Sequence, residues 1–459
     1  MTGSDQRDST SPQLERPRYH ALDALRAWAM FLGIVLHVGM AYMTSSDRTF
    51  WGVVDPSRSE WLTTFVLWVH AWRMELFFMI SGFFSCMVLQ FKDNRYFLRQ
   101  RIKKLLVPFV VWLPIVILLN EAAWTYHEWK YYGFHSDQSF VVAVYRVLVS
   151  EEFRERFRPK PDGQNFGTEH LWFLYYLMMF VAANALAVAI RWPVAIQTFW
   201  ARTVSIADWV LAKPWRIVLP CVALVPIVAI PKWHTVYEGP FSIVPVFRYF
   251  AYFGFAYLVG YLLYLNRHHL ETLKRNWAWY FLLSVVGWAF LMVRDWIQPQ
   301  FLVNVYDEGA RRGFAMNKAT PSCEFATFDQ QFLFPPVRLF ANEAAPIDTA
   351  ESLLLLPPFG VLLVMLATSL ALFGVFLRYL DRPSGLVRYW SDSAYFLYVI
   401  HLPLSSFIPS LMLPLPWNGL VKFVLGTLAT TGVGLILYEY CVRYTFIGRQ
   451  MNGPRSRTS

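Results

Sequence analysis

Three ionisable residues, Asp23, Arg26 and His37, interrupt the first long apolar stretch of the sequence, residues 21–43. A plain membrane anchor carries none, because an ionisable side chain inside a bilayer is costly and usually faces a bundle interior or a water-filled cavity. The eleven-residue separation of Arg26 and His37 is close to three helical turns, which predicts a shared helix face and roughly 16 Å between them along the axis. Gly33 lies on the same stripe. The pattern indicates chemistry, and a histidine hydrogen-bonded between helices is the competing interpretation.

The second apolar stretch, residues 62–89, carries His70, Arg73 and Glu75 at membrane depth. His70 and Arg73 are three positions apart and are expected to share a helix face. Glu75 is rotated away from Arg73 and is expected to meet a different helix. Such buried groups need partners, so they are candidates for lining a cavity; the alternative is interhelical ion pairing that fixes the register of the bundle. Gly82, which follows a serine, suits close approach of another helix backbone.

Two arginines, Arg99 and Arg101, stand in a basic run that precedes the third apolar stretch. Guanidinium groups bind phosphate oxygens through two parallel hydrogen bonds, so this pair suits a phosphate-rich cytosolic ligand. Anchoring of the helix by positive charge on the cytoplasmic side is the competing interpretation.

Further polar candidates lie in two later apolar stretches. Glu169 and His170 open the fourth stretch at its external end. Tyr398 and His401 lie three residues apart in the ninth, with Tyr395 close by, and this spacing predicts a polar track along the helix. A packed, hydrogen-bonded histidine is again the alternative.

The composition decides the class of protein that positions these residues. The chain has 459 residues, of which 56% are hydrophobic and only 16% charged, and this excludes a soluble globular protein. Stretches long enough to span a bilayer lie at about residues 21–43, 62–89, 103–120, 169–190, 215–231, 246–265, 277–293, 353–378, 392–412 and 418–441. We therefore expect an all-α fold, a polytopic membrane helical bundle of about ten transmembrane helices.

Lysine and arginine in the connections predict the orientation, because short cytoplasmic loops carry the excess of both. Residues 92–104 are strongly basic, and every second connection along the chain is basic in the same way. The long connection of residues 294–352 falls on the opposite side and leans acidic. Both termini are therefore expected to be cytoplasmic, in a multi-pass protein of the cell (inner or plasma) membrane.

One membrane domain, residues 19–445, is expected to form nearly the whole chain, with external loops at about residues 121–168 and 294–352. Residues 1–18 and 446–459 are expected to be cytoplasmic tails, and the polar composition of the first predicts disorder. The charged run EEFRERFRPKPDG in the first external loop predicts a solvated amphipathic helix that ends at the prolines.

The net charge of +10 follows from this asymmetry of the loops, and no basic or aromatic module indicates nucleic acid as a partner. The cysteines show no CxxC spacing, so neither a disulfide framework nor a zinc site is expected from them. They are Cys86, Cys221, Cys323 and Cys441.

Taken together, these residues resemble the acyltransferase 3 family of integral membrane enzymes. The resemblance rests on Arg26 and His37 in the first stretch, the Arg-x-Arg run of residues 99–101, and a tyrosine-rich ninth stretch that ends in His401. The segments YHALDALRAWAMFLGIVLHVGMAY, WRMELFFMISGFFS, HLWFL and LILYEYCVRY look like the branch of osmoregulated periplasmic glucan succinyltransferases. The match covers about residues 19–190 and 390–445, and the sequence departs from that branch in its long acidic loop.

The resemblance implies a membrane-embedded O-acyltransferase. Its donor substrate would be cytosolic acyl-coenzyme A, its acceptor a hydroxyl of an extracytoplasmic glycan, and its acyl group succinyl or acetyl. No cofactor would be bound permanently and no metal is expected. His37 would be the general base, because an imidazole with an unperturbed pKa of about 6.5 can accept a hydroxyl proton at neutral pH. Arg26 would contact the coenzyme or position an acidic partner, for which Asp23 is the nearest candidate.

The remaining candidates would bind the donor or line the cavity. They are Arg99, Arg101, Arg73, His70, Glu75, His401 and Tyr398. Ten helices with buried charges also describe a transporter or flippase, and a ligand-sensing membrane protein without chemistry is a third hypothesis. A deep histidine combined with a cytosolic Arg-x-Arg favours the enzyme, because a transporter has no reason to pair them.

Overall fold

The computed structural model describes residues 18–45, 51–155, 157–158, 167–229, 243–245, 247–297, 356–446 and 448–449. These residues are helical apart from short connections and form no β-sheet; a single isolated bridge joins Met43 and Ser59. The predicted all-α fold is confirmed. The predicted tail of residues 1–18 lies outside the described residues except for Arg18, and so do most of the external loop 294–352 and the second tail.

The helices run in chain order as α1 (His20–Gly39), α2 (Glu60–His70), α3 (Arg73–Phe91), α4 (Asn94–Arg101), α5 (Val107–Tyr131), α6 (Phe140–Val149), α7 (Glu151–Glu155), α8 (Trp172–Ala189), α9 (Val194–Leu211), α10 (Val218–Ala229), α11 (Phe247–Leu265), α12 (Leu270–Ile297), α15 (Leu356–Tyr379), α16 (Gly385–Met412) and α17 (Gly419–Leu437). Short 3₁₀ or π turns adjoin them, namely η1 (Met40–Tyr42), η2 (Ile102–Leu106), η3 (Glu169–Leu171), η4 (Pro214–Ile217), η5 (Arg267–His269) and η8 (Tyr438–Val442). Among the described residues, each of the ten predicted apolar stretches is mostly helical.

Seven helical runs among the described residues are long and apolar enough to cross a bilayer, namely His20–Met40, Glu60–Phe91, Asn94–Tyr131, Glu169–Ala189, Pro358–Tyr379, Gly385–Met412 and Gly419–Val442. The chain is therefore a multi-pass membrane protein. Shorter apolar helices accompany these runs at Phe140–Val149, Pro214–Val225 and Tyr249–Leu265.

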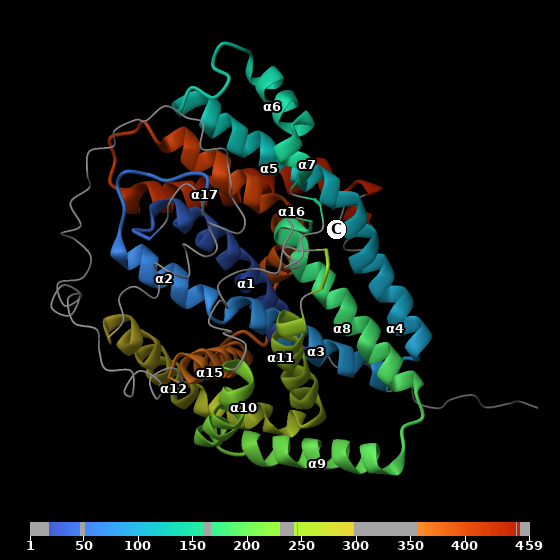
Figure 1. Ribbon diagram of the computed structural model, residues 1–459. Helices are drawn as coiled ribbons and strands as arrows, with labels where there is room; N and C mark the ends of the chain where they lie inside the picture. The colour runs from blue at the N-terminus through green and yellow to red at the C-terminus, as the bar shows by residue number, and fades with distance from the viewer. Residues whose placement is uncertain are drawn as a thin grey trace, which may run out of the picture.

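Helix α1 lies at the centre of the bundle, where it packs against α2, α3, α15, α16 and α17 (Figure 1). Its alanines are buried, and small side chains let neighbouring helices approach closely where lipid provides no hydrophobic drive for association. The polar residues of α1 are partly exposed, and they lie between these neighbouring helices. This central position is what allows one helix to bring a histidine into contact with several others.

The predicted second helix is divided into two. Helix α2 ends at His70 and α3 begins at Arg73, with Ala71 and Trp72 between them and Trp72 at φ −144 and ψ −16. The prediction that His70 and Arg73 share a face assumed one continuous helix, and the structure has two helices here. Non-helical backbone at membrane depth is tolerated only inside protein or against a cavity, and Ala71 and Trp72 are both fully buried. The break between α2 and α3 is therefore a candidate position for a cavity inside the protein.

Helices α3 and α11 approach one another through glycines. A Cβ on Gly82 would lie 1.9 Å from the Tyr257 carbonyl oxygen, and a Cβ on Gly260 would lie 1.8 Å from the Met79 carbonyl oxygen. Any larger residue at either position would force the two backbones apart. The prediction of a close approach at Gly82 is confirmed.

Within residues 121–168, which were predicted to be an external loop, α5 continues to Tyr131 and α6 follows. The charged run begins as the short helix α7, where Glu151 pairs with Arg154 at 3.4 Å and with Arg158 at 2.8 Å. A further helix, α9, occupies residues that the hydropathy pattern leaves as a connection. It runs crosswise to α8 and α11 along the lower edge of the view (Figure 1).

Candidate functional site

Helices α1 and α16 are joined by two polar contacts, one near each end of the α1 stripe. The Arg26 guanidinium donates to the Ser391 hydroxyl at 3.1 Å, and His37 Nδ1 lies 2.8 Å from His401 Nε2. Both residues of α1 thus face the same neighbour, which confirms the shared face predicted from their spacing. Asp23 accepts from Arg26 at 3.4 Å, so the expected acidic partner is in place.

The hydrogen bonds around His401 fix which atoms carry protons. His401 Nδ1 lies 2.6 Å from the Tyr398 carbonyl oxygen, which can only accept, so Nδ1 donates. In a neutral ring, His401 Nε2 then carries a lone pair and accepts the Nδ1–H of His37. His37 Nε2 is left with a lone pair of its own. The arrangement therefore presents His37 as a proton acceptor at one defined atom.

Two further groups hold this histidine pair in place. The Tyr398 carbonyl oxygen also accepts from His170 Nε2 at 3.1 Å, and the Tyr398 hydroxyl donates to the His170 carbonyl at 2.6 Å. The Trp51 ring stacks on His37, with 5.7 Å between centroids and an interplanar angle of 6°. Tyr398 therefore acts through its backbone and anchors η3, while Trp51 covers the imidazole.

Arg73 brings a buried positive charge to the same place. A Cβ built on Gly33 would lie 2.4 Å from Arg73 Nη1 and 3.8 Å from His401 Nε2, so the guanidinium occupies the space that the glycine leaves. Arg73 is 6% exposed, and its Nε has no hydrogen-bond partner among the described residues. A buried donor without a partner requires an explanation, and a substrate oxygen would supply one.

Replacing Gly33 by alanine is expected to reduce catalytic turnover by about tenfold to a hundredfold, because the new methyl group displaces the Arg73 guanidinium. The range corresponds to the loss of one hydrogen bond to a charged group, about 1.5–3 kcal/mol. Initial rates of the purified variant test this, with Gly432→Ala as the matched control because nothing lies within 4 Å of a Cβ there. Parental turnover in Gly33→Ala would show that the position of Arg73 does not matter.

Glu75 and His70 flank this group without joining it directly. Glu75 is 1% exposed and interacts electrostatically with Tyr252 on α11, which packs against α3, so it meets a different helix from Arg73, as predicted. His70, at the end of α2, lies within electrostatic range of His37 and Arg73. His70 is the last residue of α2, and Glu75 lies in the first turn of α3.

The structure places Arg99 and Arg101 in a separate region. They occupy the last turn of α4, which packs against α3 and α8. Arg99 is exposed, whereas the Arg101 guanidinium lies 5.5 Å from the Phe97 ring centroid. The π turn η2 follows immediately, and single π turns within helices are frequent at functional sites. By helical rise, Arg26 lies roughly 16 Å and Asp23 roughly 21 Å from His37 along α1.

Trp51 and Ser391 were not predicted from the sequence, and His170 was a polar candidate without an assigned role. His170 carries a weak signal as a polar residue at a helix start, but nothing in the sequence places it 5.1 Å from the His401 ring. Trp51 lies in a connection and gives no signal. Ser391 precedes His401 by ten residues, which nearly matches the eleven-residue spacing of Arg26 and His37. This match is the one sequence feature that could have indicated the contact between Arg26 and Ser391 on two parallel helices.

The site thus combines a histidine with an available lone pair, a second histidine that orients it, and a buried cation beside both. Such a group can remove a proton from a hydroxyl and stabilise negative charge that develops nearby. These are the requirements of acyl transfer to an alcohol.

Comparisons with known proteins agree with this chemistry. A family model described as an acyltransferase domain matches residues 19–439. Glucans biosynthesis protein C of Salmonella typhi is 23% identical over 427 residues, which cover 93% of this chain and 92% of that protein. The proteins of the same name from Salmonella typhimurium strain LT2 and Salmonella heidelberg strain SL476 are also 23% identical, with the same coverage. No solved structure matches the chain.

Proposed function

Because the chain belongs to the acyltransferase 3 family, whose model spans nearly its whole length, we propose that it moves an acyl group from acyl-coenzyme A to a glycan hydroxyl across the membrane. The protein is an acyltransferase, and this decides against the transporter and the ligand sensor. The observation that carries the proposed mechanism is the hydrogen-bonded pair of His37 and His401 at 2.8 Å beside Arg73.

In the proposed reaction, His37 Nε2 removes the proton from the acceptor hydroxyl as its oxygen attacks the thioester carbonyl carbon. His401 keeps His37 in the tautomer that can accept this proton. Arg73 stabilises the oxyanion of the tetrahedral intermediate. The carbon–sulfur bond then breaks, and His37 returns the proton to the leaving thiolate, so that the products are an ester and free coenzyme A.

We further propose that the donor enters from the cytoplasm. The basic connections support an orientation with ten transmembrane helices, both termini and residues 92–104 inside, in the inner or plasma membrane. The seven long apolar runs, together with the shorter apolar helices Pro214–Val225 and Tyr249–Leu265 and with α12, are compatible with that number. His37 lies near the end of α1 that would face outward, so the acyl arm would reach it from the inside while the acceptor approaches from the outside.

The acceptor is proposed to be a glucan, on the strength of the relatives' name. The acyl group is succinyl or acetyl. Mass spectrometry of periplasmic and surface glycans from a deletion strain and its parent tests both points, since one ester modification should disappear. An unchanged glycan profile would refute the acceptor class.

A vesicle assay tests the reaction itself. The purified protein is reconstituted with glucan oligosaccharides in the lumen, and succinyl- or acetyl-coenzyme A labelled in the acyl group is added outside. We expect labelled ester on the oligosaccharide only with vesicles that contain the protein. Free label that accumulates inside without ester would support transport in place of transfer.

Replacing Arg99 or Arg101 by alanine is expected to weaken binding of acyl-coenzyme A by about tenfold to a hundredfold, since each guanidinium would lose a two-pronged phosphate contact of about 1.5–3 kcal/mol. Lysine should rescue only in part, because it keeps the charge and loses the second hydrogen bond. Calorimetric titration of each variant measures this, with Lys92→Ala as a control from the same basic run. Unchanged affinity in both alanine variants would leave the run with its anchoring role alone.

A further inference from the structure

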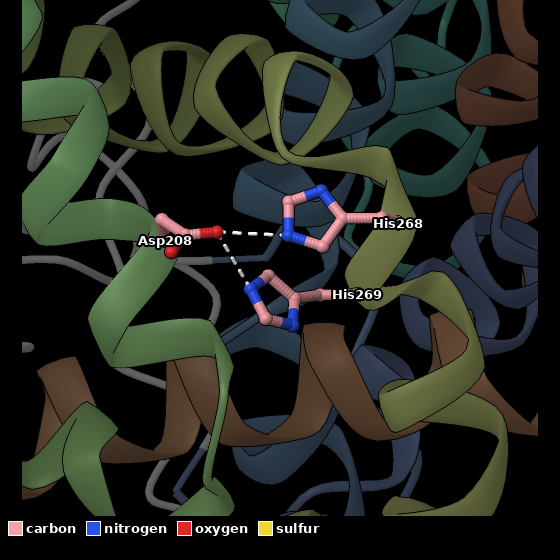
Figure 2. Close-up of side chains that lie close together, drawn as sticks. All are labelled: Asp208, His268 and His269. Carbon is pink, nitrogen blue, oxygen red and sulfur yellow. Dashed lines mark hydrogen bonds and ion pairs between the residues drawn. The ribbon is translucent and has the colours of Figure 1, made fainter.

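A compact group of metal-ligating side chains lies outside the acyl-transfer site. Asp208 on α9 and the adjacent residues His268 and His269 in η5 present three ligand atoms within 4.8 Å of one another. Figure 2 shows the two imidazoles converging on one carboxylate from the turn opposite α9. His268 Nε2 lies 2.8 Å and His269 Nε2 2.9 Å from the same oxygen, Asp208 Oδ1.

The dimensions of this cluster suit a small transition-metal ion. Imidazole nitrogens and carboxylate oxygens bind zinc at about 2.0–2.2 Å, which places neighbouring ligands of a tetrahedral ion roughly 3.3 Å apart. The observed separations of 2.8 and 2.9 Å need to open by only a few tenths of an ångström. Side-chain rotation accomplishes this without movement of the helices, because His268 and Asp208 are about half exposed or more.

The chemistry of the donor atoms also fits a metal ion. Two imidazoles and one carboxylate are a donor set that favours zinc and its first-row neighbours over magnesium or calcium, which prefer oxygen ligands.

We propose that Asp208, His268 and His269 bind one divalent transition-metal ion of the zinc class, with the fourth position open to water. The ion would join α9 to the turn between α11 and α12, residues about sixty positions apart. A neighbouring hydrogen bond already joins these two segments, since the Asn266 side-chain amide donates to the Val204 carbonyl at 3.3 Å. The site is independent of the proposed acyl transfer.

The test uses the full-length protein with an affinity tag that contains no histidine, stripped with a chelator and then titrated with zinc chloride. We expect close to one equivalent of bound zinc by elemental mass spectrometry, and a rise in the unfolding temperature. His268→Ala, His269→Ala and Asp208→Asn should each weaken zinc binding at least tenfold. His135→Ala, which removes a histidine outside the cluster, should bind as the parent does.

The Asp208→Asn variant separates a metal site from a hydrogen-bonded contact, because an amide oxygen still accepts from imidazole N–H groups but is a poor zinc ligand. Zinc that stabilises the parent and not this variant supports the proposal. Zinc binding far below one equivalent in the parent would overturn it. So would parental zinc affinity in all three variants, because the ion would then lie elsewhere.

Discussion

Replacing His37 by alanine is expected to reduce acyl transfer by about 10²–10⁴-fold, the range in which a positioned general base acts. The physical reason is the loss of the lone pair on His37 Nε2, which the hydrogen bond to His401 leaves available. Transfer of labelled acyl groups by the purified variant measures the effect, with thermal unfolding recorded in the same sample. His135→Ala serves as the control, since it lies in the connection between α5 and α6.

His401→Ala distinguishes a positioning role from general base catalysis. His37 keeps its imidazole in this variant but loses the acceptor that holds its Nδ1–H, so the proton is free to move to Nε2. We expect a smaller loss than in His37→Ala, and no further loss when both substitutions are combined, because both act on one step. Near-parental rates in His37→Ala would remove this histidine from the mechanism.

Periodicity predicted the part of the site that lies on single helices. Arg26 and His37 are three turns apart in the sequence, and both contact α16 in the structure, because regular helical rise alone determines which residues share a face. The same rule does not apply to His70 and Arg73. It requires a continuous helix, and the backbone leaves helical geometry at Trp72. Hydropathy gives no sign of that break, because Ala71 and Trp72 are themselves apolar.

The contacts between helices could not be predicted from the sequence. Nothing in the pattern pairs His37 with His401, because the neighbour of a buried face depends on how the whole bundle packs. The cluster of Asp208, His268 and His269 was missed for the same reason, since α9 was expected to be a connection. The cysteines alone predict no zinc site, and these ligands are not cysteines.

A buried ion pair between Lys422 and Asp55 is a second contact that the sequence pattern did not predict. Lys422 Nζ lies 2.8 Å from Asp55 Oδ2, and both side chains are 2% exposed. Lys422 also donates to the Leu413 carbonyl at 3.2 Å, and Asp55 Oδ1 accepts from the Ser57 amide at 2.8 Å. The ion pair therefore holds the connection after η1 against the start of α17. Both charged side chains are hydrogen-bonded.

Replacing Lys422 by methionine is expected to destabilise the protein by about 3–5 kcal/mol, because the Asp55 carboxylate would remain buried without its partner. Asp55→Asn should cost a similar amount. The double variant should cost less than the sum of the two, since no isolated charge is left. Reversible unfolding in mixed detergent micelles measures all three. The exposed pair Arg158 and Glu151, whose side chains are 61% and 55% exposed, provides the control.

Neutralising that control pair should change stability by at most about 1 kcal/mol, because exposed ion pairs are screened by water. Changes of this small size in the Lys422 and Asp55 single variants would contradict the prediction. Loss of the ion pair should also affect catalysis, because the connection that contains Asp55 also contains Trp51, whose ring stacks on His37. We therefore expect Lys422→Met to lower acyl transfer even under conditions where the variant stays folded, and the double variant to recover part of it.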